Sequence, residues 1–404
     1  MKILVVNGGS SSLKYKVFDM THESILAVGQ VEKIGIAERQ PVTYEPAGRE
    51  KVKSEVALAD HREAVGFVLE QLSAPGSGIV ESLTEIRAVG HRVLTGMEEF
   101  KDSTVVGDKE VAILKDMIEV GPLHMPANIA GIEACMAFMP NVPQVAVFDT
   151  AFHQTMPESS YLYALPYEYY EKYGVRRYGF HGTSHRYLTQ RTATLLGKPQ
   201  EELNLITCHL GNGSSLVAVK NGKCFNTSMG FTPLEGLVMG TRCGTIDPAL
   251  VPFLANKLNL DWDEMDRVMN HESGLLGLSG VSSDMRDLGE ARASGNTRAQ
   301  IAFDVFMQSL IHYIGAFYLE LGGADAIIFS GGIGENDAEV RELVCKQLAV
   351  LGVSVDFELN SRIRSKEIRL STEDSNIEVW VVPTNEEVMI ARDTLALAQE
   401  VVRA

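Results

Sequence analysis

Short apolar runs alternate along this chain with longer stretches in which apolar residues recur every three or four positions. The runs at residues 3–6, 14–18 and 144–148 predict β-strands. Asp60 and Glu63 form a helix-start signature before Ala64, Val65, Val68, Leu69 and Leu72, which share one helical face. The longest helix is expected from about 298 to 321, where the apolar residues at helical spacing are Ala302, Phe306, Leu310, Tyr313, Phe317 and Leu321. This alternation predicts an α/β fold.

Two glycine-serine segments resemble each other. Residues 6–13 read Val-Asn-Gly-Gly-Ser-Ser-Ser-Leu and residues 209–216 read His-Leu-Gly-Asn-Gly-Ser-Ser-Leu, and each lies between two strand-like segments. Coincidence between two serine-rich hairpins is one interpretation. The other is a duplicated domain in which both loops serve one ligand. Such loops expose backbone N–H groups and serine hydroxyls without bulky side chains, so they suit a polyphosphate.

Composition narrows the class of protein. The chain has 404 residues, 45% hydrophobic, with 36 basic and 53 acidic side chains and a net charge of −17. The length predicts two or three domains, and the acidic balance argues against nucleic-acid binding. An anionic substrate would therefore need a site with basic side chains on an otherwise acidic protein surface.

Cysteine usage and the chain's start indicate a compartment. The five cysteines are scattered and contain no C-x-x-C pair, which favours a reducing cytosol over a disulfide scaffold or zinc ribbon. The apolar run after Met1-Lys2 is too short for a signal peptide, and no stretch approaches a membrane span. We expect a cytoplasmic protein with no membrane partner.

Nucleotide signals are weak when taken singly. No Walker A motif is present, and residues 332–337 begin like a dinucleotide fingerprint but carry Asp337 at the third glycine position. This stretch follows the expected strand 326–329 and precedes a helix expected from 338 to about 351, so a tight strand-to-helix turn explains it equally well. The acidic residues of 383–387 follow another strand, where they suit either Mg²⁺ or a helix N-terminus.

Three settings hold candidate catalytic groups. Ser184, His185 and Asp149 invite a hydrolase interpretation, but the G-x-S-x-G elbow is absent, and a buried structural role is favoured for His185. His181 precedes a helix expected at 183–196, where free N–H donors attract negative charge. Arg92 follows a strand-like segment and Arg242 lies in Gly-Thr-Arg-Cys-Gly, settings in which a guanidinium pairs with carboxylate or phosphate.

The chain resembles the acetokinase family over essentially its whole length. Nine ordered motifs carry the resemblance, at residues 7–14, 90–93, 122–128, 147–157, 176–185, 209–213, 229–236, 332–336 and 383–387. The resemblance implies the duplicated α/β fold of actin, hexokinase and the heat-shock ATPases (ribonuclease H-like domains) with the active site in an interdomain cleft. It also implies direct, reversible, Mg²⁺-dependent transfer of the ATP γ-phosphoryl group to acetate, with Mn²⁺ as an alternative metal, giving acetyl phosphate and ADP.

The resemblance also implies residue roles. Arg92, Asp149, His181 and Arg242 would be catalytic, Asn7 and Glu386 would organise the metal, and Arg92, Leu94, Leu123, Phe180 and Pro233 would hold acetate. Nucleotide contacts would come from Ser10, Ser12, Lys14, His209, Leu210, Gly211, Asn212, Gly213, Asp284, Met285, Arg286, Gly332, Ile333, Gly334, Glu335 and Asn336. Residues 1–150 with a helix at 388–404 would form the N-terminal domain and residues 151–387 the nucleotide-binding domain. A homodimer is expected.

This sequence departs from the family pattern beside both arginines. The family's His-Arg-Val-Val-His-Gly-Gly-Glu reads here His-Arg-Val-Leu-Thr-Gly-Met-Glu at 91–98, and Thr-Arg-Ser-Gly-Asp becomes Thr-Arg-Cys-Gly-Thr at 241–245. Leu94 adds a methylene to a pocket wall, which predicts discrimination against propionate or butyrate. Propionate or butyrate as acceptor, pyrophosphate as donor, and a non-catalytic nucleotide switch stay open as alternatives.

Overall fold

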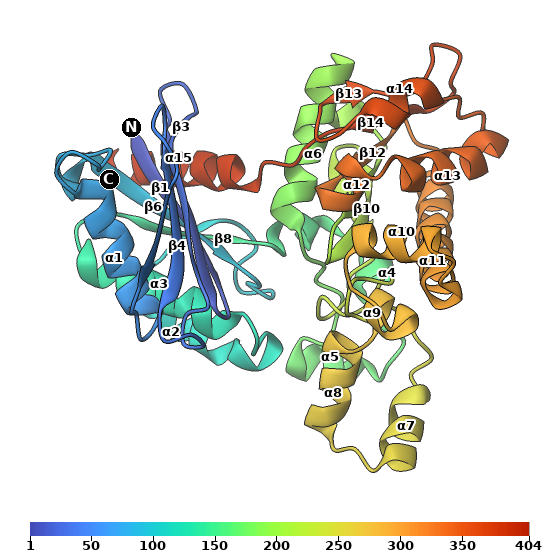
Figure 1. The fold of residues 1–404 in the computed structure, drawn as a ribbon, viewed down its shortest axis with the longest axis horizontal. Helices are drawn as coiled ribbons and strands as arrows, with labels where there is room; N and C mark the ends of the chain where they lie inside the picture. Colours follow the sequence, from blue (N-terminus) through green and yellow to red (C-terminus); the bar gives the residue numbers. More distant parts are fainter. Residues whose placement is uncertain (404) are drawn as a thin grey trace. The chain divides into compact units, whose positions relative to one another are not determined.

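The computed structural model describes residues 1–403 and divides into two compact units. Unit 1 comprises Met1–Ala151 and Asn385–Ala404, and unit 2 comprises Phe152–Thr384. Each unit has its own sheet and its own apolar core (Figure 1). None of the helices in residues 1–403 is long and apolar enough to cross a membrane.

Unit 1 is built on an eight-stranded sheet in the order β5-β4-β3-β2-β1-β6-β8-β7. The strands are β1 Lys2–Gly9, β2 Ser12–Asp19, β3 Ser24–Glu32, β4 Gln40–Pro46, β5 Val52–Val56, β6 Ile86–Val93, β7 Thr104–Val105 and β8 Gln144–Phe148. The helices are α1 His61–Ser73, α2 Asp108–Asp116, α3 Met125–Phe138 and α15 Glu386–Arg403. Val89 packs into the core that α1 and α3 cover, whereas its neighbour Gly90 faces Ile390 and Thr394 of α15. The two faces of the sheet are thus covered by different helices.

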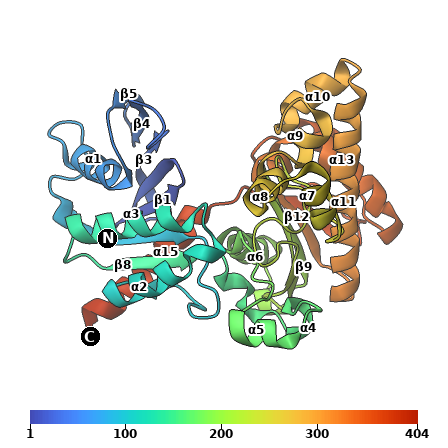
Figure 2. The ribbon, with the colours of Figure 1, turned by 90° about the horizontal axis from the view of Figure 1, so that it is seen from below.

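Unit 2 repeats this plan on a six-stranded sheet, β11-β10-β9-β12-β14-β13. Its strands are β9 Leu205–Leu210, β10 Ser214–Lys220, β11 Lys223–Thr227, β12 Ala326–Ser330, β13 Ile368–Arg369 and β14 Glu378–Val381. Its helices are α4 Glu158–Tyr161, α5 Tyr167–Tyr173, α6 Gly182–Leu196, α7 Leu250–Leu258, α8 Trp262–His271, α9 Gly274–Ser279, α10 Met285–Ala293, α11 Thr297–Leu321, α12 Gly331–Asn336, α13 Ala338–Leu348 and α14 Phe357–Arg362. Figure 2 shows the long α11 beside α13, and these helices cover one face of the sheet while α6 covers the other.

The strand connections show that the fold is duplicated. In both sheets an antiparallel hairpin, β1–β2 or β9–β10, is followed by two parallel strands, β6 and β8 or β12 and β14. The two glycine-serine segments are the turns of these equivalent hairpins. The duplicated α/β fold expected from the sequence is therefore present, and coincidence between the two loops is excluded.

Three local expectations need correction. The segment after β12 is a short helix, α12, and not a simple turn, because Gly331 N–H donates to Glu335 Oε1 and Arg341 fixes the Gly334 carbonyl. The helix that follows ends at Leu348, and a 3₁₀ turn continues to Leu351. Arg92 lies within β6 and not after it.

Candidate active site

Unit 1 gathers its candidate residues at the carboxyl ends of three adjacent parallel strands. Asn7 lies near the end of β1, Arg92 near the end of β6, and Asp149 directly after β8. The strand registers pair Val6 with His91 and Val93 with Phe148, so these positions are neighbours along one sheet edge. Ligands of open α/β sheets bind at such an edge.

Arg92 is held by a bidentate ion pair. Its Nε donates to Asp149 Oδ1 at 3.0 Å and its Nη2 to Asp149 Oδ2 at 2.7 Å, and Asp149 is fully buried. Glu386 Oε2 lies 3.9 Å from Arg92 Nε. Burial raises the pKa of Glu386 to about 7. The positive charge of Arg92 lowers this pKa, and the negative charge of Asp149 raises it further. Glu386 is thus a carboxylate that a cation would stabilise.

A second group of polar residues lines a small pocket of about 160 Å³ beside the first hairpin. Asn7, Lys14, Lys16 and Glu387 are among its lining residues, and Lys16 pairs with Glu387 at 3.1 Å. Lys14 is exposed. Ser10 is exposed and Ser12 half-buried at the same hairpin turn, so these three predicted nucleotide contacts belong to unit 1.

The predicted acetate-pocket residues are divided between the units. Leu94 and Leu123 belong to unit 1, Phe180 and Pro233 to unit 2. Leu94 is nearly buried, whereas Leu123 is 46% exposed. Asn128, for which no role was predicted, donates to the Gly8 carbonyl at 2.7 Å and accepts from Leu94 N–H at 3.0 Å. Its side chain therefore fixes the Leu94 wall relative to the β1–β2 turn.

In unit 2, His181 occupies the N-cap of α6 with a left-handed backbone (φ 56°). A residue other than glycine adopts this conformation at a cost and only where its surroundings hold it. The His181 Nδ1 lies 2.8 Å from Ser215 Oγ, and its ring stacks on His209 with centroids 4.4 Å apart. The packing thus fixes both the position and the rotation of the imidazole.

Arg242 and His181 both border the space beside Gly213, where glycine has no side chain. A β-carbon placed on Gly213 would lie 3.4 Å from Arg242 Nη1 and 3.6 Å from His181 Nε2. Nη1 donates to the Pro233 carbonyl at 3.4 Å, and no ion pair of Arg242 occurs within residues 1–403. Burial lowers the Arg242 pKa. A desolvated guanidinium without a carboxylate partner is suited to an anionic ligand.

The predicted nucleotide segments of unit 2 come together through two glycines. A β-carbon on Gly331, just before residues 332–336, would lie 2.6 Å from the Leu210 carbonyl oxygen. One on Gly240 would lie 1.7 Å from Asn212 Oδ1 and 3.1 Å from the carbonyl oxygen of Ser283, beside 284–286. Only glycine permits these approaches. Residues 209–213, 284–286 and 332–336 therefore form one neighbourhood, and Gly332 has open space where a side chain would be.

Two further contacts support this neighbourhood: those of Arg341, which was missed from the sequence, and those of Glu335, which was expected only as a nucleotide contact. The fully buried Arg341 donates to the carbonyl of Gly334 at 2.9 Å. It also donates to the side-chain and backbone oxygens of Asn360 in α14 and to the carbonyl of Ile363 at the end of that helix. Glu335 accepts from the N–H groups of Gly331 and, at 3.4 Å, Thr384, so it ties α12 to the end of β14. Their roles depend on contacts with segments distant in sequence, for which the sequence holds no signal.

The hydrolase triad is not assembled. Ser184 Oγ lies 2.8 Å from His209 Nδ1 and 2.7 Å from Thr384 Oγ1, while His185 is fully buried between Thr207 and Ser215. Asp149 gives both carboxylate oxygens to Arg92. The favoured structural role of His185 agrees with this burial.

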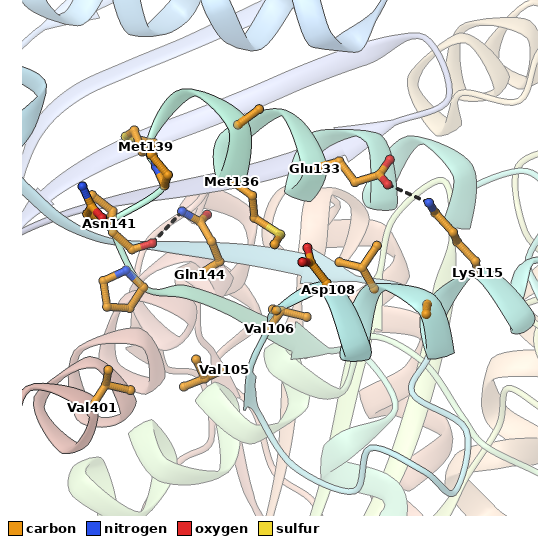
Figure 3. A pocket seen from close by; sticks show the side chains of 17 residues that line it. Val105, Val106, Asp108, Lys115, Glu133, Met136, Met139, Asn141, Gln144 and Val401 are labelled. Atoms are coloured by element: carbon orange, nitrogen blue, oxygen red, sulfur yellow. Dashed lines mark hydrogen bonds and ion pairs between the residues drawn. The ribbon is translucent and has the colours of Figure 1, made fainter. Parts of the chain in front are cut away.

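A larger pocket of about 870 Å³ lies elsewhere in unit 1 (Figure 3). Its lining includes Val105, Met136, Gln144 and Val401, with the Lys115–Glu133 ion pair on its rim. Gln144 begins β8, whereas Asp149 follows its end. The pocket is thus at the opposite end of that strand from the arginine–carboxylate cluster and contains none of the candidate residues.

Duplicated α/β units with glycine-rich turns and positioned cations define a class of protein suited to anionic ligands such as polyphosphates. The sequence profile described as "Acetokinase family" matches residues 2–392. An acetate kinase of Treponema denticola is 54% identical over 399 residues, covering 99% of this chain and 100% of that protein. The chain therefore belongs to the acetokinase family.

Solved structures agree with this assignment. The crystal structure of Porphyromonas gingivalis acetate kinase has a TM-score of 0.93 at 44% identity, covering 98% of this chain and 99% of that one. A propionate kinase from Francisella tularensis has a TM-score of 0.91 at 37% identity, with the same coverages. The fold is thus shared with kinases named for two short carboxylic acids.

Proposed function

We propose that this enzyme transfers the γ-phosphoryl group of ATP to acetate, reversibly, giving acetyl phosphate and ADP. The observation that carries the proposal is the pair of donors at Gly213, because Arg242 Nη1 and His181 Nε2 border one space and Arg242 has no carboxylate partner in the described chain. Family membership supports the identity of both substrates.

The proposed chemistry needs alignment and positive charge more than proton transfer. Acetate is ionised at neutral pH, so it attacks phosphorus without a general base. The γ-phosphoryl group passes through a loose transition state with charge spread over its equatorial oxygens. His181 and Arg242 would donate to those oxygens, and Arg92 would hold the acetate carboxylate. Asp149 would act by orienting Arg92, since both its oxygens already accept from that guanidinium.

The residues of unit 1 fit a magnesium ion. Glu386 offers a half-buried carboxylate whose raised pKa reflects the cost of charging it without a further cation, and Asn7 offers an amide oxygen near the end of β1. Within residues 1–403, His, Cys, Asp and Glu side chains form no cluster of three or more that could hold a metal ion. Asn7 and Glu386 would hold Mg²⁺ together with phosphate oxygens and water, and the ion would neutralise phosphate charge.

Different residues would select the two substrates: apolar side chains the acyl group, and the glycine-lined segments of unit 2 the nucleotide. Leu94, packed against Gly121 and fixed by Asn128, would limit the acyl chain to that of acetate, with Leu123, Phe180 and Pro233 as further walls. The adenosine of ATP would lie over Gly332, where the backbone is open, with residues 209–213 and 284–286 beside it and Ser10, Ser12 and Lys14 toward the phosphates.

A hydroxylamine trap tests the proposal. Acyl phosphate is converted to a coloured hydroxamate with ATP, GTP or pyrophosphate as donor and acetate, propionate or butyrate as acceptor. We expect ATP with acetate to give the highest kcat/KM, and Arg242→Ala to lose it. Absence of acetyl hydroxamate with every donor would refute the function. Preference for butyrate would refute only the role of Leu94. Acetate-independent ADP release would indicate a nucleotide switch.

We propose further that the protein is a cytoplasmic homodimer whose unit 1 is the N-terminal domain and unit 2 the nucleotide-binding domain. Four cysteines are buried as free thiols, which suits a reducing compartment. The helices α7 and α8 expose Phe253, Leu258 and Trp262, which supports a self-association surface. Light scattering of the purified protein, with Phe253→Asp as the variant, tests the dimer, and a monomeric wild type would refute it.

A further inference from the structure

Ser215 on β10 connects two histidines in unit 2. Its Oγ lies 2.8 Å from His181 Nδ1 and 2.8 Å from His185 Nε2, and His185 Nδ1 lies 2.7 Å from Thr207 Oγ1. Ser215, His185 and Thr207 are fully buried. The four side chains therefore form a continuous series of hydrogen bonds from Thr207 to His181.

If the buried Ser215 hydroxyl donates one of these hydrogen bonds and accepts the other, the series has two possible directions. In the first, Thr207 donates to His185, His185 to Ser215, and Ser215 to His181 Nδ1, which leaves the His181 proton on Nε2. In the second, every bond is reversed, and the Thr207 hydroxyl must donate elsewhere. Across residues 1–403 the Thr207 hydroxyl has no hydrogen bond besides the one to His185. A buried donor without an acceptor costs about 1–3 kcal/mol, so the first direction is favoured.

We propose that the buried Thr207–His185–Ser215 chain fixes His181 as the neutral tautomer with its proton on Nε2. Nε2 is the ring nitrogen 3.6 Å from the β-carbon position of Gly213, beside Arg242 Nη1. The inference rests on the proposed function, in which that space receives a phosphoryl oxygen. Ser215, His185 and Thr207 are then positioning residues: they hold a proton at the atom that faces the substrate.

The charged and titratable groups around His181 agree with a neutral ring. His209 stacks on it, Arg242 borders the same space, and His185 faces it through Ser215. Moving the proton to Nδ1 would reverse the whole chain, and protonating both nitrogens would add a second cation beside Arg242. Burial, together with His153 and His209, lowers the pKa of His185 well below its ordinary value, so His185 stays neutral and able to relay the direction set by Thr207.

The test combines the tautomer with the kinetics. In protein labelled with ¹⁵N-histidine, the His181 signals are identified by their loss in His181→Gln, and we expect Nε2 protonated and Nδ1 unprotonated at pH 7. Thr207→Val should mix the tautomers and lower kcat about 10-fold or more, with the KM for ATP unchanged. Thr207→Ser should restore both. Thr192→Val is the matched control, because Thr192 is a fully buried threonine whose hydroxyl has no partner.

If circular dichroism shows that Thr207→Val does not fold, Ser215→Ala is used in its place, because it removes the hydrogen bond to His181 Nδ1. An imidazolium or a protonated Nδ1 in the wild type would overturn the proposal, as would a Thr207→Val protein with unchanged tautomer and kcat. A different failure, full activity of His181→Gln, would refute the function assigned to His181 while leaving the tautomer measurement to stand by itself.

Discussion

The Arg92–Asp149 ion pair gives the most quantitative test of unit 1. Asp149 is fully buried and accepts two hydrogen bonds from Arg92, whose side chain is 27% exposed. Asp149→Asn keeps the shape but removes the negative charge, and it sets an amide N–H₂ group against an Arg92 donor. We expect both the free energy of unfolding and the turnover to fall.

The size of the loss follows from the geometry. Unit charges 2.7 Å apart attract by about 6 kcal/mol at an effective dielectric constant of about 20, offset in part by the desolvation that asparagine avoids. Removing one partner of a buried pair costs about 3–5 kcal/mol. Glu386, 3.9 Å from Arg92, stays as a second negative charge, so we expect the lower end, about 3 kcal/mol. The pKa of Glu386 should also fall, because Asp149 now raises it.

Two measurements are needed because the chain has two units. Both tryptophans, Trp262 and Trp380, belong to unit 2, so fluorescence follows that unit, whereas far-UV circular dichroism follows both. For a domain of this size, about 3 kcal/mol lowers Tm by about 6–12 °C, seen by dichroism. Turnover in the hydroxamate assay should fall about 10²-fold or more, since Arg92 loses its orientation.

Glu23→Gln is the control, because it breaks another bidentate arginine pair in the same unit. Arg392 donates to both Glu23 oxygens at 2.7 Å, but the two side chains are 42% and 41% exposed. An exposed pair contributes about 1 kcal/mol or less, and turnover should not change. If Asp149→Asn matched Glu23→Gln in both Tm and turnover, burial of the Arg92 pair would have no special effect and the reasoning would be wrong.

Four further substitutions test the assigned role of Arg242 and the packing and protonation of the core. Arg242→Ala should lower kcat about 10²–10³-fold with little change in Tm, because it removes a desolvated cation without a partner; a large fall in Tm would assign Arg242 a structural role. Burial lowers the pKa of His91 to about 4, so the stability it contributes is present above pH 6.5 and is lost as pH falls toward 4, by up to about 3 kcal/mol. Urea unfolding of His91→Gln at pH 5 and 7.5 should show a smaller pH dependence than the wild type. Gly90→Ala places a β-carbon 2.3 Å from Thr394 Oγ1 and should destabilise by about 1–3 kcal/mol, whereas Gly315→Ala, which meets open space in α11, should stabilise slightly in the same thermal scan.

Local patterns in the sequence predict those parts of the fold that depend on near neighbours. The strand 144–148 matches β8, and the apolar face expected for the helix after Asp60 is the buried face of α1. Asp60 caps Glu63 N–H as expected, although the Glu63 carboxylate accepts from Ala59 N–H and not from Asp60. In each case the residues that decide the structure lie within a few positions of one another.

Contacts between distant segments were beyond such patterns. Three glycines and two polar residues predict a turn at 331–336, but a hydrogen bond within the segment and the buried Arg341 stabilise it as a short helix. Arg92 and Asp149 are 57 positions apart, and Thr207, His185 and Ser215 are joined only when α6 packs on the β9–β10 hairpin. The resemblance to a family named His181 and Arg92, but it could not indicate which groups hold them in place.

The duplication also explains where His181 and Glu386 stand in the chain. Each repeat begins with a hairpin and a third antiparallel strand, continues with two parallel strands, and ends with a helix: α6 comes after β8, with α4 and α5 between them, and α15 comes after β14. The final helix of each repeat packs in the unit built by the other, since α6 covers β9 in unit 2 and α15 covers β1, β6 and β8 in unit 1. Glu386 begins α15 directly after the chain has returned to unit 1 at Asn385, whereas His181 caps α6 only after α4 and α5 have followed the entry into unit 2 at Phe152. Unit 1 is therefore built from both ends of the chain, so Glu386 joins Asn7, Arg92 and Asp149 only when α15 packs on the sheet of unit 1.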